Sequence, residues 1–133
     1  MNLPELKIGK LVAQVPIIQG GMAIRLSTAP LAAAVANEGG IGLIAASGMG
    51  LDELRKEIRM ARELTGGKGI IGINAMVAAR QFLDLITTAA EEGIDLIVAG
   101  AGFSRDIFAV GKKYGVEVVP IVSSARLAQT AEK

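Results

Sequence analysis

The chain has 133 residues, of which 51% are hydrophobic and 20% charged, and its formal net charge is +1. This length and composition predict one globular unit and exclude a disordered chain. Cysteine and histidine are both absent, which rules out disulfides, thiol nucleophiles, histidine general bases, and thiolate or imidazole metal sites, so we expect no metal site.

The amino-terminal segment, MNLPELKIGK, alternates charged residues with isolated apolar ones and lacks the continuous apolar core of a secretory signal. No charge-free apolar run reaches the roughly 20 residues needed to cross a bilayer. We therefore expect a cytoplasmic protein with no membrane partner. Balanced charge and only 3% aromatic residues also argue against nucleic acid as a partner.

Five short apolar runs, each bounded by glycine, proline or small residues, predict β-strands. Their ranges are 15–19, 41–46, 70–75, 95–99 and 116–122. None of the runs alternates strongly between polar and apolar residues. That pattern is typical of strands covered on both faces in a parallel sheet.

Helical patterns separate these runs. Ser27 or Thr28 is expected to cap a helix that carries Pro30 in its first turn and ends at the Gly39-Gly40 pair. The next helix is predicted from an apolar stripe that ends before Gly66-Gly67, with Asp52–Lys56 and Arg59–Glu63 as exposed i,i+4 ion pairs. The stripe consists of Leu51, Leu54, Ile58, Ala61 and Leu64. Two further helical patterns precede Gly93 and Gly115.

The repeated alternation of strand and helix indicates an α/β fold with parallel strands joined by right-handed crossovers. Two architectures fit: a five-stranded, flavodoxin-like open parallel sheet, or the N-terminal portion of a (β/α)8 TIM barrel with about five βα units. The length favours the open sheet. The barrel is favoured because residues 126–133 contain no glycine or cap that ends a helix. Residues 1–133 are then expected to form a single partial domain.

The segment PIIQGGMA places a buried strand directly before two glycines, at the carboxyl edge where α/β proteins bind ligands. Gly20 and Gly21 lack a Cβ, so the main chain can approach a flat ring and direct amide hydrogens at it, including those of Met22 and Ala23. Gln19 adds a side-chain amide. The alternative is a tight turn that uses glycine only for its conformation.

Three further residues lie at or just after the ends of predicted strands, at the same edge. Asn74, in GINAM, carries an amide that both donates and accepts, as the edge of a pyrimidine-like ring requires; the alternative is a bond within its own turn. Gly100 leaves room for a broad ligand, and Ser123 can donate a hydrogen bond or, with Ser124, cap the last helix. No acid–base pair is evident, so no catalytic residue is assigned.

Together, PIIQGGMA, GGIGLIAASG, GINAM, GIDLIVAGAG and VVPIVSSARLAQTAEK resemble the nitronate monooxygenase family, formerly called 2-nitropropane dioxygenases. The related FMN-dependent enoyl-[acyl-carrier-protein] reductases are similar too. The resemblance covers almost the whole chain and implies an FMN-binding barrel. It further implies that the backbone around Gln19, Gly20, Met22 and Ala23, together with Asn74, contacts the flavin ring or ribityl chain.

The resemblance also implies an FMN-dependent oxidoreductase that uses O2 to denitrify alkyl nitronates. The family continues into a glycine-glycine-histidine segment with its usual catalytic histidine, which this sequence lacks. We therefore expect a truncated chain, inactive alone, whose open edge is covered by a complementing C-terminal half or by a homo-oligomer. Two alternatives stay open: an enoyl reductase that uses NAD(P)H and an enoyl thioester, and a non-enzymatic flavodoxin-like binding module.

Overall fold

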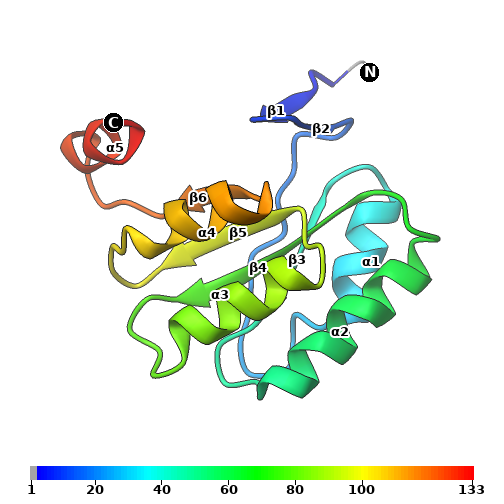
Figure 1. The fold of residues 1–133 in the computed structure, drawn as a ribbon. Helices are drawn as coiled ribbons and strands as arrows, with labels where there is room; N and C mark the ends of the chain where they lie inside the picture. Colours follow the sequence, from blue (N-terminus) through cyan, green and yellow to red (C-terminus); the bar gives the residue numbers. More distant parts are fainter. Residues whose placement is uncertain (1–2) are drawn as a thin grey trace.

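The computed structural model describes residues 3–133, and its centre is a four-stranded parallel sheet. The strands stand in the order β3 (Ile41–Ala45), β4 (Ile70–Met76), β5 (Leu96–Gly100) and β6 (Glu117–Pro120). The helices that alternate with them are α1 (Ala29–Asn37), α2 (Leu51–Leu64), α3 (Phe82–Glu91) and α4 (Asp106–Tyr114). Figure 1 shows these helices along one side of the sheet.

The sheet keeps the order of the chain, because each strand pairs with the strand before it. A flavodoxin-like sheet instead reverses its strand order and carries helices on both faces. Sequential strands with helices outside are the wall of a (β/α) barrel. The prediction of an N-terminal portion of a (β/α)8 barrel is therefore confirmed, and the open-sheet alternative does not hold.

The two faces of the sheet are buried in different ways. On the helix side, Ile44, Ile73 and Ile97 are fully buried in a large cluster with the helices. On the opposite face, which is the barrel interior, Leu43 and Leu96 pack in a smaller cluster near the amino ends of the strands. Apolar side chains on both faces explain why the strand sequences show no polar alternation.

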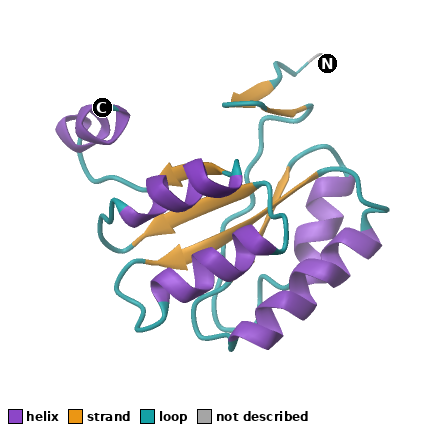
Figure 2. Ribbon diagram, in the orientation of Figure 1, coloured by secondary structure: helices purple, strands orange, loops and turns teal. Residues whose placement is uncertain are grey.

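A β-hairpin covers the interior face near the amino ends of the strands (Figure 2). It consists of β1 (Leu6–Ile8) and β2 (Leu11–Ala13), joined by a two-residue turn in which Gly9 has φ 55°. The Lys10 N–H donates to Glu117 Oε1 at 3.0 Å, which ties the turn to the start of β6. The sequence analysis did not predict this hairpin, although LKI and LVA on either side of Gly-Lys are a hairpin pattern.

Of the run predicted as the first strand, 15–19, only Ile18 forms a parallel bridge within residues 3–133, to Ile41. The chain bends at Val15, whose carbonyl accepts the Ile17 N–H at 2.8 Å. Regular pairing ends there because the Leu43 N–H donates to Gln19 Oε1, at 3.1 Å, in place of a backbone carbonyl. Pro16 has no N–H to donate. The prediction of a full strand is therefore wrong, although the segment does lie parallel to β3 at the position of a fifth strand.

The start of α1 differs from the prediction. Thr28 is the N-cap residue, but its hydroxyl makes no capping hydrogen bond. The Ala29 N–H donates instead to Glu57 Oε2 of α2 at 2.7 Å, so a neighbouring helix supplies the cap. Pro30 does lie in the first turn, as expected.

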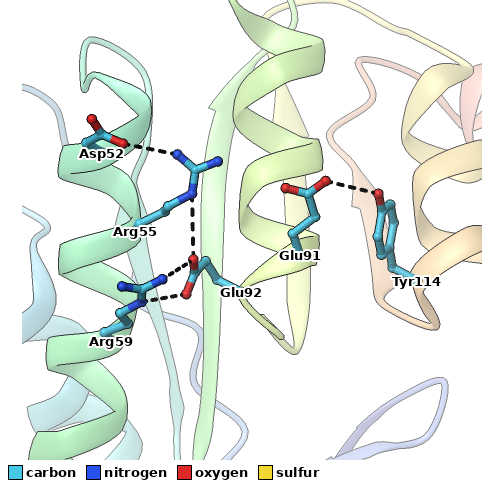
Figure 3. Close-up of polar contacts among 6 residues, drawn as sticks. All are labelled: Asp52, Arg55, Arg59, Glu91, Glu92 and Tyr114. Atoms are coloured by element: carbon cyan, nitrogen blue, oxygen red, sulfur yellow. Dashed lines mark hydrogen bonds and ion pairs between the residues drawn. The ribbon is translucent and has the colours of Figure 1, made fainter.

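Helix α2 spans the predicted range, but its ion pairs are not the predicted ones. Asp52 pairs with Arg55 within the helix at 3.2 Å, whereas the other ion pairs drawn in Figure 3 reach Glu92, which follows α3. Arg59 binds both carboxylate oxygens of Glu92, at 2.7 and 2.8 Å, and Arg55 approaches the same carboxylate at 3.6 Å. The expected partners Lys56 and Glu63 form no ion pair in the described part of the chain. The arginines therefore join α2 to the end of α3, where two oxygens of one partly buried carboxylate are within reach.

The final helix, α5 (Ala125–Glu132), stands apart from the sheet in Figure 1 and has no buried residue. Ser124 caps it by accepting the Leu127 N–H at 3.2 Å, which confirms the capping role for Ser124. Within residues 3–133, no helix combines the length and apolarity that a membrane span needs.

Candidate ligand site at the carboxyl edge

The glycine loop and Asn74 meet on the interior face of the sheet. Asn74 is in register with Val98 of β5, and Val98 belongs to the interior cluster. Residues in register on neighbouring strands point to the same face, so the Asn74 side chain also points into the barrel. Its amide makes no side-chain hydrogen bond within residues 3–133, although Asn74 is only half-exposed.

Gly21 packs directly on Asn74. A Cβ built on Gly21 would stand 2.9 Å from Asn74 Cγ and closer still to Asn74 Cβ. Gly20, next to it, has no atom within 4 Å of such a Cβ. One glycine therefore lets the loop touch the amide residue, and the other leaves open space above the loop. Residues 53 positions apart form one surface, as the sequence analysis expected of the carboxyl edge.

The interior of the loop is organised by Ser27, which the sequence analysis considered only as a helix cap. Its side chain is fully buried and accepts the Met22 N–H at 2.8 Å. This differs from the expectation that the Met22 N–H faces a ligand, because that hydrogen is used within the loop. The Met22 side chain is 46% exposed, and Ala23 is also exposed.

The outer side of the loop is held by an ion pair. Arg25 binds the carboxylate of Glu53, in the first turn of α2, with nitrogen–oxygen distances of 2.9 and 3.1 Å. These hydrogen bonds hold the pKa of Glu53 below its ordinary value. Arg25 has φ 57°, and Ala101, after β5, has φ 54°. Left-handed conformations in non-glycine residues cluster at functional sites, and both of these follow the carboxyl edge.

Gly100 and Ser123 form a second group on this edge. Gly100 is buried, and a Cβ there would stand 3.0 Å from Ile121 Cδ1. Ser123 is exposed and lines a cavity of about 350 Å³ between the ends of β5 and β6 and α5. Met76 pairs with Gly100 and is 44% exposed. It lies two residues beyond Asn74, on the same face of β4, and separates the two groups.

The acidic residues at the opposite edge serve the fold. Asp95 Oδ2 accepts the Ile71 N–H at 2.9 Å and pairs with Arg62 at 2.8 Å. Glu91 accepts a hydrogen bond from Tyr114 at 3.3 Å (Figure 3). In the part of the chain that the structure describes, no acidic cluster is arranged to hold a metal ion. The structure therefore places several carboxylates in structural hydrogen bonds and ion pairs at one edge, whereas the other edge carries glycines, amides and small residues beside the Arg25–Glu53 pair.

Successive parallel strands, outer helices and small residues at the carboxyl edge define the ligand-binding end of a (β/α)8-barrel protein. A family model described as nitronate monooxygenase matches residues 5–119. The chain belongs to the nitronate monooxygenase family.

Individual proteins are similar to this chain in sequence or in fold. FabK from Thermotoga maritima is 36% identical, with a TM-score of 0.82 over 88% of this chain and 37% of its own. A Mycobacterium tuberculosis protein named (3aS,4S,5R,7aS)-5-hydroxy-7a-methyl-1-oxo-octahydro-1H-indene-4-carboxyl-CoA dehydrogenase is 29% identical over 86% of this chain and 31% of its own. A nitroalkane oxidase from Streptomyces ansochromogenes shares the fold at 22% identity, with a TM-score of 0.78 over 90% of this chain and 44% of its own. The chain thus spans less than half the length of each.

Proposed function

We propose that the chain forms one side of the flavin site in an FMN-dependent oxidoreductase of the nitronate monooxygenase type, with a small nitronate as substrate. The observation that carries the proposal is the contact between Gly21 and Asn74. It joins a glycine loop and an amide side chain into one surface, at the edge where barrel enzymes bind ligands.

The groups on this surface fit the edge of a flavin ring. The Asn74 amide has no side-chain partner in residues 3–133, and neither do the N–H groups of Gly20, Gly21 and Ala23. Donors and an acceptor therefore remain available, as a ring that alternates carbonyl and N–H groups requires. The open space above Gly20 lets a flat group approach the main chain.

The residues of this chain act by binding and orientation. FMN, when bound, supplies the electron-transfer chemistry, and protein groups place the ring and tune its surroundings. Asn74 would hydrogen-bond the ring edge, and Gly20 and Gly21 would keep a side chain out of its plane. The chain contains no histidine, so its own residues offer no imidazole for proton transfer. We propose that turnover requires the rest of a complete barrel.

A second candidate is a flavin-dependent reductase that acts on a thioester with NAD(P)H. The thioester substrate of this candidate is favoured by the relative named as a carboxyl-CoA dehydrogenase, at 29% identity. The two candidates use the same flavin surface and differ in the electron source. A nitronate would reduce the flavin without a nicotinamide, whereas a reductase needs the nicotinamide first.

The flavin assignment is tested in the protein that carries the complete barrel, by titrating it into FMN and following fluorescence. We expect Asn74→Ala to weaken binding by about 1 to 3 kcal/mol, or roughly 5- to 150-fold, because the bound ring would lose a hydrogen-bond partner. Asn37→Ala is the matched control, since Asn37 donates to Leu64 O at the opposite edge. Equal FMN affinity for wild type and Asn74→Ala would remove the assignment of Asn74.

The reaction is tested in the protein that carries the complete barrel. Oxygen uptake with a nitronate and no nicotinamide would support the monooxygenase. Anaerobic bleaching of the flavin by NADH, followed by reoxidation with an enoyl thioester, would support the reductase instead. Neither reaction in the presence of bound FMN would contradict both candidates.

A further inference from the structure

Ser27 is the buried centre of the glycine loop. Its side chain has no exposed surface, and it sits between the loop and the start of α1. The hydroxyl donates to Gly20 O at 3.0 Å and accepts the Met22 N–H at 2.8 Å. It therefore bonds the backbone on both sides of Gly21, the residue that touches Asn74.

Gln19 completes this arrangement. Its Nε2 donates to Ser27 Oγ at 2.8 Å and also to the carbonyl of Gly20. Its Oε1 accepts the Leu43 N–H of β3 at 3.1 Å. The hydroxyl of Ser27 is thus connected through Gln19 to β3, which is fully buried. These bonds fix the position of the loop relative to the sheet.

These bonds determine which groups the loop offers to a ligand. The Met22 N–H and the Gly20 carbonyl are used internally, whereas the N–H groups of Gly20, Gly21 and Ala23 have no partner in the described residues. A loop held in one shape loses less conformational entropy when it binds. Ser27 is therefore placed to select the free donors and to fix their direction.

We infer that Ser27 is a positioning residue, which holds the 20–23 loop against Asn74 in the shape that receives the flavin. The inference rests on the proposed function for its ligand, but the shape of the loop can be measured without one. Ser27 touches no ligand in this role. It acts through the Gly20 carbonyl and the Met22 N–H.

The test compares Ser27→Ala with Thr65→Val. Both substitutions remove one buried hydroxyl that bonds the backbone, because Thr65 Oγ1 donates to Arg62 O at 3.2 Å beyond the end of α2. We expect Ser27→Ala to weaken FMN binding about tenfold and to speed amide exchange at Met22 about tenfold. Thr65→Val should lower the unfolding midpoint but leave both of these quantities at wild-type values.

Two results would overturn the inference. One is a Ser27→Ala variant with wild-type exchange at Met22, and the other is equal loss of FMN affinity in Ser27→Ala and Thr65→Val. If the wild-type protein with the complete barrel binds no FMN, the proposed function fails, and exchange at Met22 still decides the role of Ser27. If Ser27→Ala does not fold, the wild-type protein alone provides the test. The amide hydrogen of Met22 must then exchange more slowly than that of Ala23. Equal exchange rates would refute the positioning role of Ser27.

Discussion

Replacing Gly21 by alanine tests the contact on which the site depends. The added Cβ would stand 2.9 Å from Asn74 Cγ and nearer still to Asn74 Cβ. Carbon atoms in contact normally lie about 3.5 to 4.0 Å apart. The loop or β4 must therefore move by more than about 0.5 Å, and Asn74 Cβ cannot move aside because it is fixed to the strand backbone.

Overpacking of this kind costs about 1 to 3 kcal/mol, which corresponds to a fall in melting temperature of roughly 4 to 12 °C for a chain of this size. Gly20→Ala is the matched control. It adds the same methyl group one residue earlier, where no atom lies within 4 Å. Thermal unfolding followed by circular dichroism measures both variants.

Comparing the two variants cancels the change in stability that comes from replacing a glycine as such, since both substitutions reduce the entropy of the unfolded chain by a similar amount. We expect Gly20→Ala to melt at or slightly above the wild-type temperature and Gly21→Ala clearly below it. Equal melting temperatures for the two variants would refute the packing of the loop on Asn74. FMN affinity should fall in Gly21→Ala as well, because a displaced loop no longer presents its amides beside Asn74.

Three further substitutions probe the fold. Gly42→Ala places a Cβ over the carbonyl of Ala32, 2.7 Å from Ala32 Cα, so urea unfolding should show a loss of about 3 kcal/mol or more. Glu92→Gln should make the free energy of unfolding fall less steeply as the pH is lowered into the acid range. Hydrogen bonds from Arg59 lower the pKa of Glu92 from its ordinary 4.5, so its contribution is present above about pH 4.5 and is lost as pH falls through the lowered value. Ser124→Ala should cost α5 about 1 kcal/mol, seen as faster amide exchange at Leu127.

Each of these has a result that contradicts it. Wild-type stability in Gly42→Ala would mean that α1 does not approach β3 so closely. An unchanged acid limb in Glu92→Gln, with Glu63→Gln as the control for loss of one carboxylate, would show that the bond to Arg59 contributes nothing. Unchanged exchange at Leu127 would remove Ser124 as the cap of α5.

The repeating elements of this fold could be predicted because their signals are local. The apolar stripe of α2 predicted residues 51–64, and the structure has the helix there. The central strands lie within the predicted ranges, give or take a residue. Buried parallel strands and amphipathic helices each carry their own periodicity, so the order of elements, and with it the barrel wall, is readable from sequence.

The connections between elements could not be predicted in the same way. Gln19 ends the pairing of its segment through Leu43, 24 residues away, and Glu57 caps α1 from another helix. Arg59 pairs with Glu92 rather than with a neighbour on its own helix. Sequence patterns predict hydrogen-bond and ion-pair partners that are near in the chain, whereas the folded structure brings distant residues into better geometry for the same bonds. Ser27 was missed for the same reason, since its bonds depend on how the loop closes.

The two edges of the sheet carry different kinds of residue, and this has a consequence for how such a protein can change. Ion pairs between arginine and acidic side chains join α2 to its neighbours at the amino edge (Figure 3). The carboxyl edge carries one such pair, Arg25–Glu53, and is otherwise lined by glycine, asparagine and exposed apolar side chains. Substitutions in the loops at the carboxyl edge can therefore change which molecule binds there without breaking the ion pairs at the amino edge. Ligand selectivity and folding stability can therefore change independently of each other in this fold.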